Sequence, residues 1–427
     1  MNLKTMLEPA AAAERSADAV GVVAEYNPFH NGHAYHLSRA KEITGCENAI
    51  VIMSGNFTQR GEPAIADKSA RARMALLNGA DLVLELPVWF ATASAEYFAG
   101  AAVRLLQATG ITRSICFGAE TAEPESLRRA ARLMAEEPRD FKAYLRTGLA
   151  SGATYARAYA EALRACGCPE FRKPNDILAL EYVKAIEKLG GTLTPYVVKR
   201  TSDYWDRFRH GADTSKGTWS ASAARSALRA GEFEALKKII PGTCSGQSAF
   251  EILMADTNNG TCLAELNRLS EIFKYILLMR GREWAKGIMD IGEGLENRLL
   301  RSAGQASALE DIITAAGTRR YTRTRITRAA LHLILEMTRA EFEGFTSQGG
   351  PKYLRVLGFR TDKAPLLREI ERRGELPLIT NLKAAARILD ADAMRMLQKE
   401  IVSADIYRLT RGELNWASEI VREIVKV

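Results

Sequence analysis

The first half of the chain alternates between two hydrophobic periods. Four short runs are almost wholly apolar: residues 20–26, 48–54, 80–87 and 113–118. Three neighbouring segments carry apolar residues at the three-to-four-residue spacing of a helix: residues 33–43, 67–79 and 94–110. Strands and helices in turn predict a parallel sheet with helices on both faces. The nearly continuous apolar character of the strands fits burial on both sides.

The pattern becomes helical toward the C-terminus. Residues 123–190 are mainly helical in pattern, residues 192–200 resemble one more strand, and residues 220–231 form a helix with a Ser cap and a Gly stop. After about residue 235 the strand signals fade, and helical periodicity dominates the later segments: 263–281, 328–345 and 382–402. We therefore predict an α/β fold in three parts: a flexible tail at 1–19, a domain with a Rossmann-like parallel sheet at 20–235, and a mainly α-helical domain at 236–427.

The composition is that of an ordinary globular protein, with 47% hydrophobic and 26% charged residues. The formal charge of +8 suits a polyanionic partner, although many enzymes are mildly basic. No apolar run is long enough to span a bilayer, and the N-terminus lacks the apolar core of a secretory signal. Only Cys166 and Cys168 of the six cysteines are close together, which is a poor zinc signal. Reduced thiols in a cytoplasmic protein, with no membrane association, fit best.

The stretch "GVVAEYNPFHNGHAYHL", residues 21–37, holds three of the five histidines: His30, His33 and His36. It follows the first predicted strand directly and leads into a helix. Ligands bind at the carboxyl ends of strands in an open parallel sheet, and a helix start favours anions. His30 and His33 can therefore donate hydrogen bonds to one phosphate chain, while Gly32 allows a base or ribose to approach the backbone. Two alternatives stay open: a zinc site, for which neighbouring carboxylate or cysteine ligands are missing, and plain helix residues.

A longer string of motifs resembles one family. The strings are "EYNPFHNGHAYH", "VIMSGNFTQRGEPAIADKSARARMALLNGADLVLELP", "FGAE", "KPNDILALEYVKAI", "VKR", "SASAAR", "EGLENRL" and "RYTRTRITRAALH". Together they resemble the bacterial tRNA(Met) cytidine acetate ligases, within the nucleotidylyltransferase and class I aminoacyl-tRNA synthetase superfamily with its His-x-Gly-His signature. The resemblance runs from about Gly21 to the C-terminal region, and it implies a nucleotidylyltransferase-like catalytic domain followed by a helical, tRNA-binding one.

The resemblance also implies an activity. Such an enzyme activates acetate with ATP, with Mg²⁺ expected on the triphosphate, and forms acetyl-adenylate. It then acetylates the N(4) amine of the wobble cytidine of elongator tRNA(Met), giving N(4)-acetylcytidine, AMP and pyrophosphate. By the same resemblance, the ATP-binding residues are Val23, Ala24, Glu25, Tyr26, Asn27, Pro28, Phe29, His30, Asn31, Gly32, His33, Ala34, Tyr35, His36, Gly118, Asn175, Lys199 and Arg200.

Four residues are candidates for the chemistry itself. We expect His30 and His33 to stabilise charge on the phosphates, because activation by ATP depends mostly on positioning and charge stabilisation. "SASAAR" resembles the superfamily's second phosphate-binding signature, in which Ser220 donates a hydroxyl proton and Arg225 adds a forked cation. An ordinary capped helix is the alternative for this segment. No residue resembles a covalent nucleophile, and we predict no metal ligands in the protein.

The loop "SGNFTQRGEPAIADK" follows the second strand and so faces the same site. Asn56, Arg60 and Lys68 are its candidates for holding acetate or the tRNA end of the reaction. Its Gly, Asn and Pro content is equally that of a plain loop, and Asp67-Lys68 is equally typical of a surface ion pair.

The run "RRYTRTRITR", residues 319–328, is the candidate RNA-binding surface. Arginine suits phosphate, and a tyrosine among arginines can stack on an exposed base. On a helix, Arg320 and Arg323 would share a face, as would Arg325 and Arg328. A solvated helix face is the alternative. The full candidate set is Arg319, Arg320, Tyr321, Arg323, Arg325 and Arg328.

Two other functions remain open at this point. The first is a nucleotidylyltransferase of a small phosphorylated metabolite, which would use the same histidines and ignore tRNA. The second is a tRNA-binding protein that turns over no ATP. The basic, helical C-terminal half speaks against the first, and the intact His-x-Gly-His motif speaks against the second.

Overall fold

The structure, a computed structural model, describes residues 18–120, 123–153, 155–169, 171, 173–199, 220–242, 247–318, 320–414 and 419–427. Of the predicted tail, residues 1–17 lie outside this described part, whereas Ala19 already belongs to the first strand. No helix within the described ranges combines the length and the apolar character needed to cross a membrane.

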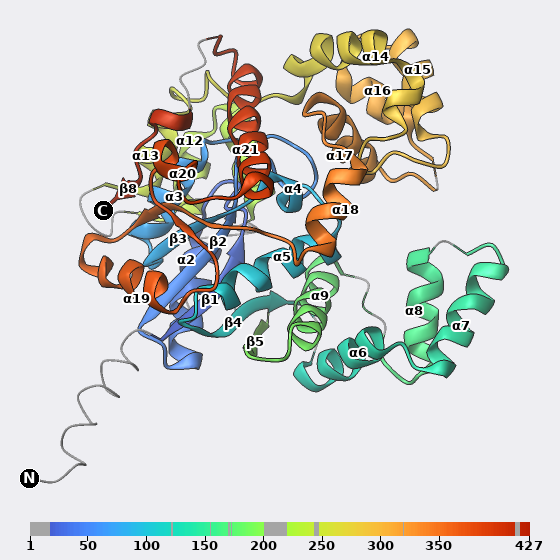
Figure 1. Ribbon diagram of the computed structural model, residues 1–427. Helices are drawn as coiled ribbons and strands as arrows, with labels where there is room; N and C mark the ends of the chain where they lie inside the picture. The colour runs from blue at the N-terminus through green and yellow to red at the C-terminus, as the bar shows by residue number, and fades with distance from the viewer. Residues whose placement is uncertain are drawn as a thin grey trace, which may run out of the picture.

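A single eight-stranded sheet forms the centre of the molecule (Figure 1). Its order is β5-β4-β1-β2-β3-β6-β7, with β8 paired to β6. The strands are β1 (Ala19–Ala24), β2 (Asn48–Ser54), β3 (Leu82–Leu86), β4 (Thr112–Ala119), β5 (Thr194–Lys199), β6 (Leu354–Phe359), β7 (Leu378–Ile379) and β8 (Val425–Lys426). β1 to β5 are parallel, and their order reverses between β1 and β4. Such a switch point opens a crevice for ligands at the carboxyl ends of the strands.

Helices cover both faces of the sheet, as the strand pattern predicted. One face packs against α2 (Asn31–Thr44), α3 (Lys68–Leu77), α11 (Ala221–Ala230), α12 (Phe233–Ile239) and α13 (Ala249–Asp256). The other core includes α4 (Val88–Ala91), α5 (Ala95–Ala108), α6 (Pro124–Glu136), α7 (Arg139–Ala150), α8 (Tyr155–Ala165), α9 (Pro174–Lys188), α18 (Arg339–Ser347), α19 (Pro365–Arg373), α20 (Leu382–Ala385) and α21 (Ala391–Thr410). A third, smaller core joins α14 (Ser270–Ala285), α15 (Leu295–Gln305), α16 (Leu309–Ala316) and α17 (Arg323–Ile334).

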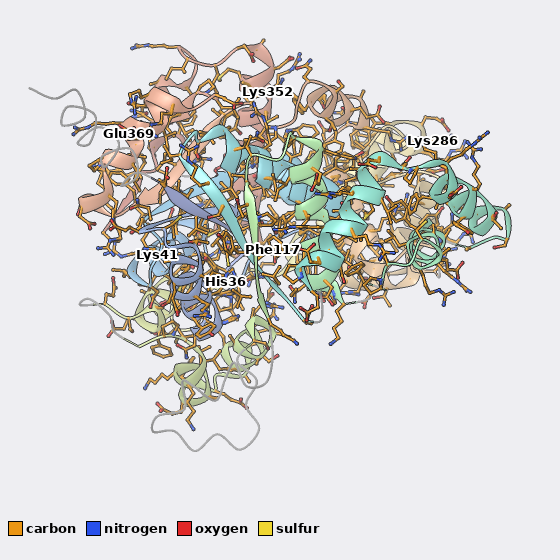
Figure 2. The ribbon with its side chains drawn as sticks, turned by 90° about the horizontal axis from the view of Figure 1, so that it is seen from below. His36, Lys41, Phe117, Lys286, Lys352 and Glu369 are labelled. Atoms are coloured by element: carbon orange, nitrogen blue, oxygen red, sulfur yellow. The ribbon has the colours of Figure 1, made fainter. Side chains whose placement is uncertain are left out.

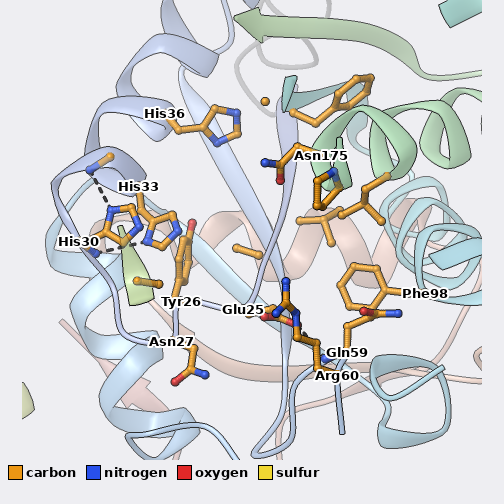
Figure 3. Close-up of a pocket in the computed structure, with 18 of the residues that line it drawn as sticks. Glu25, Tyr26, Asn27, His30, His33, His36, Gln59, Arg60, Phe98 and Asn175 are labelled. Atoms are coloured by element: carbon orange, nitrogen blue, oxygen red, sulfur yellow. Dashed lines mark hydrogen bonds between the residues drawn. The ribbon is translucent and has the colours of Figure 1, made fainter. Parts of the chain in front are cut away.

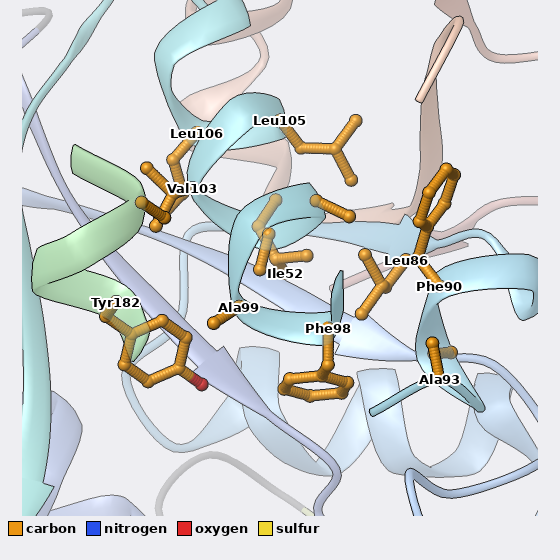
Figure 4. Packing of buried hydrophobic residues seen from close by; sticks show 14 of the residues in the cluster. Ile52, Leu86, Phe90, Ala93, Phe98, Ala99, Val103, Leu105, Leu106 and Tyr182 are labelled. Atoms are coloured by element: carbon orange, nitrogen blue, oxygen red, sulfur yellow. The ribbon is translucent and has the colours of Figure 1, made fainter. Parts of the chain in front are cut away.

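Alternate residues of the strands supply the two large cores. Val51 of β2 belongs to the core under α2, whereas its neighbour Ile52 belongs to the core under α5 (Figure 4). Gly21 allows α5 to press closely on β1, because a Cβ there would lie 2.5 Å from Cδ1 of Leu106. This close packing fixes the strand whose end carries the histidine stretch.

Three strands in the C-terminal half differ from the expectation of helices alone after residue 235. β6 pairs with β3 in the antiparallel sense, and β7 and β8 pair with β6, so this half extends the sheet. β7 and β8 have two residues each, too few to show a period. The mainly helical character of this half is confirmed, and the domain boundary near residue 235 stays a prediction.

Candidate active site

A cavity of about 350 Å³ lies at the carboxyl ends of β1 and β4, at the switch point of the sheet (Figure 3). In the view from below, His36 of α2 and Phe117 of β4 both lie near the middle of the molecule (Figure 2), and both line this cavity. The residues predicted from sequence that line it are Val23, Ala24, Glu25, Tyr26, Asn27, His30, Gly32, His33, His36, Arg60, Gly118, Asn175 and Arg225. These residues come from five separate chain segments, which meet in one place.

His30 and His33 form a stacked pair at the start of α2, with ring centroids 3.7 Å apart. Nδ1 of His30 accepts a hydrogen bond from the backbone N–H of Gly32 at 3.1 Å. Nδ1 of His33 accepts one from the backbone N–H of His30 at 3.3 Å. In a neutral ring whose Nδ1 is an acceptor, the proton resides on Nε2. Both rings therefore carry an N–H donor at Nε2, as a phosphate site requires.

Aromatic contacts hold this pair in place. The ring of Tyr26 meets the rings of His33 and Phe29 edge-on, each with centroids 4.8 Å apart. Among the described residues, no group of three His, Cys, Asp or Glu is placed to hold a metal ion. The zinc alternative for the histidines therefore finds no ligand set within that part of the chain.

α11 is fastened to the same corner of the sheet. Arg225 donates a hydrogen bond from Nη1 to the backbone oxygen of Asn27 at 2.7 Å, and its side chain lines the cavity. Ser220 caps α11, with its Oγ accepting from the N–H of Ala223 at 3.1 Å. Ser220 is not among the lining residues, whereas Ala221 is. Arg225 thus fits the predicted phosphate contact better than Ser220 does.

Another side of the cavity is polar and comes from the loop after β2. Glu25 accepts a hydrogen bond at Oε1 from the backbone N–H of Gln59, at 2.7 Å. The side-chain amide of Gln59 in turn donates to the backbone oxygen of Ala93 at 2.7 Å. Burial raises the pKa of the Glu25 carboxyl, while the N–H of Gln59 and the cations Arg71, Arg60 and Arg225 lower it.

The remaining wall is mainly apolar and suits an aromatic base. Asn175 stands at its edge, where its Nδ2 donates to Glu120 Oε1 at 2.5 Å. Nε2 of His36 lies 3.6 Å from Sγ of Cys116, whose pKa burial raises to about 12. Sequence patterns did not identify several lining residues, which are Gln59, Ala95, Phe98, Phe117, Pro174, Leu178, Tyr182 and Ala221.

Two candidates from the loop after β2 do not reach the cavity. Lys68 is completely buried, with its Nζ 2.6 Å from Glu85 Oε1 and 2.7 Å from Glu419 Oε1. Asn56 is also buried, and its Oδ1 accepts from the N–H of Lys68 at 3.0 Å. The expectation that they hold acetate or tRNA is therefore corrected, because both are committed to internal contacts. The surface-pair alternative for Asp67-Lys68 fails for the same reason.

Six described residues of the implied ATP-binding set are not part of the cavity lining, and a seventh member of the set is not described. Lys199 is exposed at the end of β5, and Arg200 lies outside the described residues. Asn31 points elsewhere and donates from Nδ2 to the backbone oxygen of Lys238 at 3.1 Å. The other members that are not part of the cavity lining are Pro28, Phe29, Ala34 and Tyr35.

The arginine run is only partly a surface feature. α17 begins at Arg323, so Arg320 and Tyr321 precede the helix and the predicted face shared by Arg320 and Arg323 is corrected. Tyr321 is only 5% exposed and its hydroxyl donates to the backbone oxygen of Glu293, which removes it as a stacking platform. Arg328 is similarly buried.

The exposed part of the run consists mainly of two side chains. Arg320 pairs with Glu293 at 2.7 Å on the surface, and Arg323 donates to Thr314 Oγ1 at 2.9 Å. Arg325 is half-buried, with a guanidinium 3.7 Å from Glu293. Arg319 lies outside the described residues. An exposed ion pair contributes little to stability, so a phosphate can compete for these cations.

Comparison with known proteins defines the class and then the family. The fold and the His-x-Gly-His cavity are those of a nucleotidyl transferase, and the model of the HIGH Nucleotidyl Transferase family matches residues 17–419. A protein of Caldanaerobacter subterraneus subsp. tengcongensis named tRNA(Met) cytidine acetate ligase is 36% identical, over 92% of this chain and 95% of its own length. A protein of the same name from Thermoanaerobacter sp. is 38% identical over 91% and 94%. The chain belongs to the tRNA(Met) cytidine acetate ligase family.

Solved structures agree with this placement. A crystal structure of Thermotoga maritima TmcAL bound with alpha-thio ATP has a TM-score of 0.83 and is 32% identical, covering 93% of this chain and 95% of its own. The apo form of the same protein has a TM-score of 0.85 and is 31% identical, covering 96% and 100%.

Proposed function

We propose that this chain is an ATP-dependent ligase that activates acetate as acetyl-adenylate. It transfers the acetyl group to the N(4) amine of the wobble cytidine of elongator tRNA(Met), giving N(4)-acetylcytidine, AMP and pyrophosphate. The names of the relatives and the ATP analogue bound to the Thermotoga maritima protein support this function. The observation that carries it is the stacked histidine pair in the lining of the switch-point cavity, where each Nδ1 accepts a backbone N–H at the start of α2.

The cavity suits adenylation because attack on the α-phosphate transfers charge to the phosphate oxygens. Donors fixed in advance stabilise that charge without reorganising during the reaction. The Nε2 donors of His30 and His33 and the guanidinium of Arg225 serve this purpose. Mg²⁺ bound with the triphosphate would neutralise part of its charge and so favour attack on the α-phosphate.

Arg60 is the candidate partner of the acetate carboxylate. It is an exposed cation on the cavity lining, and it comes from the same loop as the Gln59 amide. Guanidinium groups bind carboxylates through paired hydrogen bonds. On the outside of the molecule, Arg320 and Arg323 provide the exposed cations for the tRNA backbone.

The test is mass-spectrometric nucleoside analysis of elongator tRNA(Met) incubated with the protein, Mg²⁺, ATP and isotope-labelled acetate. Labelled N(4)-acetylcytidine that requires ATP is the expected result. The His33→Asn variant is a matched control, because an Asn Oδ1 can replace Nδ1 as the acceptor at the helix start while the Nε2 donor is lost. Label at the wild-type rate in a folded His33→Asn protein would contradict the phosphate assignment.

The same experiment separates the two alternatives. Pyrophosphate release that needs a phosphorylated metabolite and ignores tRNA would favour a nucleotidylyltransferase of small molecules. Binding of tRNA with no turnover of ATP would favour a non-catalytic binding protein. The cytoplasmic location stays a prediction, and the five described cysteines are free thiols.

A further inference from the structure

Acetyl transfer needs a group that takes a proton from the amine of cytidine. The lone pair of this amine is delocalised into the ring, so its nucleophilicity is low. Its attack on the acetyl carbon makes the nitrogen acidic, and a base positioned nearby then accelerates the step. The inference below rests on the proposed function, because it concerns the second half of that reaction.

The lining of the cavity offers few side chains with a lone pair for this proton. Nδ1 of His30 and Nδ1 of His33 each accept a backbone N–H, and their Nε2 atoms carry protons. Arginine stays protonated in proteins. Burial raises the pKa of the Tyr26 and Tyr182 hydroxyls, which keeps them neutral.

Two titratable groups are left, and they lie on opposite sides of the cavity. His36 lies near Asn175 on the apolar wall, whereas Glu25 lies near Gln59 and Arg60 (Figure 3). Among the described residues that line the cavity, Glu25 is the one carboxylate.

Glu25 is also held firmly. It directly follows β1 and precedes Tyr26, whose ring contacts His33. Its Oε1 accepts from the N–H of Gln59 at 2.7 Å, and its backbone oxygen accepts from Nη1 of Arg71 at 2.5 Å. The carboxylate of Glu25 is therefore held in place, and Glu25 is the neighbour in sequence of Tyr26, whose ring packs against His33.

The charged groups around Glu25 come from three further elements. Arg60 lies on the loop after β2, Arg71 on α3 and Arg225 on α11, and the buried hydroxyl of Tyr182 faces it from α9. Burial outweighs these cations and raises the pKa of Glu25, so the carboxylate is a stronger base than an exposed one.

We propose that Glu25 is the general base of acetyl transfer. The N(4) lone pair attacks the carbonyl carbon of acetyl-adenylate, and the new C–N bond forms as the C–O bond to the phosphate breaks. AMP leaves with that electron pair as its phosphate oxygen. The proton of N(4) passes to the carboxylate of Glu25, which later returns it to water.

The experiment separates the two half-reactions in a Glu25→Gln variant. A glutamine Oε1 can still accept the N–H of Gln59, so the local fold is kept. Because Glu25 lines the ATP cavity, we expect acetate-dependent exchange of pyrophosphate into ATP to be retained and to fall much less than acetyl transfer does. Single-turnover acetyl transfer to tRNA should fall by about 100-fold or more, the usual effect of a general base.

Two further readouts distinguish a base from a merely structural residue. Wild-type transfer should rise with pH as Glu25 ionises, and this limb should be absent in Glu25→Gln and retained in Glu25→Asp. Hydroxylamine, a strong nucleophile that needs no base, should capture the bound adenylate of Glu25→Gln in proportion to its pyrophosphate exchange, whereas transfer to tRNA should fall much further. Glu62→Gln is the control, since it removes a carboxylate that acts on Arg225 but does not line this cavity.

Each outcome decides the matter. Wild-type transfer by Glu25→Gln would place the base elsewhere. Equal loss of exchange and transfer, or loss of hydroxamate formation, would assign Glu25 to adenylation or to the fold. A wild-type protein that shows no acetate-dependent exchange at all would refute the proposed function, which is distinct from failure of the variant alone.

Discussion

Glutamine in place of Glu400 should make the protein increasingly more stable than wild type as the pH rises. Glu400 lies in a buried charge network with Lys68, Glu85, Arg355 and Glu419, each at most 5% exposed. Lys68 Nζ lies 2.6 Å from Glu85 and 2.7 Å from Glu419, and Arg355 Nη1 lies 2.6 Å from Glu85. Arg422 joins this network by pairing with Glu419 at 3.0 Å and also with Asp67, so three cations face four carboxylates, and this excess favours a proton on one carboxylate.

Glu400 is the carboxylate that holds this proton. Burial and then the charge of Glu85 raise its pKa from the usual 4.5 to about 8, and its Oε2 accepts the N–H of Val88 at 2.6 Å. The folded state binds this proton more tightly than the unfolded chain does. The stabilisation it provides is therefore complete below about pH 4.5 and lost as the pH rises toward 8. At about 1.4 kcal/mol per pKa unit, the change approaches roughly 5 kcal/mol.

The assay is urea unfolding of wild type and Glu400→Gln, followed by tryptophan fluorescence, from about pH 5 to pH 8. The glutamine amide can donate to Glu85 and its oxygen can accept from Val88, so the two proteins should match near pH 5. By pH 8 the variant should be more stable by several kcal/mol. A difference in free energy of unfolding that stays constant over this range would refute the reasoning, because it would mean that Glu400 is ionised in the fold.

Lys68→Met provides a contrast within the same network. It removes the cation shared by three carboxylates, and breaking a buried pair on one side costs about 3–5 kcal/mol. We expect that loss at neutral pH. Opposite signs for the two variants would show that charge balance, rather than the number of ion pairs, stabilises this region.

Three more predictions concern the site, the surface and the packing between them. His33→Asn should lower ATP-dependent turnover by about 100- to 1,000-fold without a change in melting temperature. His33→Ala should in addition lose about 1 kcal/mol of stability in thermal unfolding, because the side-chain cap of α2 is removed. Arg320→Glu with Arg323→Glu should weaken tRNA binding in low salt and reduce the slope of log affinity against log salt by about 2, with ATP binding unchanged in calorimetry; equal tRNA affinity would remove these arginines from the interface. Gly61→Ala should lower the free energy of unfolding in urea by about 1–3 kcal/mol, because a Cβ there would lie 2.8 Å from the backbone of α17. Gly45→Ala is the control, since Gly45 has a similar φ but open space around it, and it should lose only the smaller free energy of backbone strain. Equal losses of stability in the two variants would contradict the packing argument.

The sequence pattern was most informative where the chain is locally regular. The five parallel strands and the helix after His30 follow directly from hydrophobic period and turn residues. The sequence pattern did not predict β6, because this strand contains a buried arginine, Arg355. The charge of Arg355 is balanced by Glu85 and Glu419, which are distant in sequence. Partners so far apart in sequence leave no local signal.

The site shows the same division. The histidine stretch could be predicted as a binding site because His30, Gly32 and His33 follow the end of one strand directly. Gln59, Phe98 and Tyr182 reach the cavity from three other segments, and each resembles an ordinary loop or core residue in sequence. The prediction that Lys68 binds substrate was wrong, because the Gly- and Pro-rich loop beside it suggested exposure. In the fold its charge is neutralised by carboxylates from distant parts of the chain.

Two sets of long-range contacts connect the C-terminal half to the catalytic sheet: the buried charge network and the packing of Gly61 on α17. The buried network joins Lys68 of α3 and Glu85 of β3 to Arg355 of β6 and Glu400 of α21. Removing β6 or α21 would leave the buried side chains of Glu85 and Lys68 with fewer ionic partners, and breaking a buried pair costs more than breaking a surface pair. On the other side, the loop that lines the cavity packs through Gly61 directly against the backbone of α17. These contacts connect β6 and α21 to the sheet, whereas the domain boundary near residue 235 stays a prediction. α17, which carries the exposed Arg323, therefore contacts the same loop whose Gln59 donates a hydrogen bond to Glu25, the proposed general base.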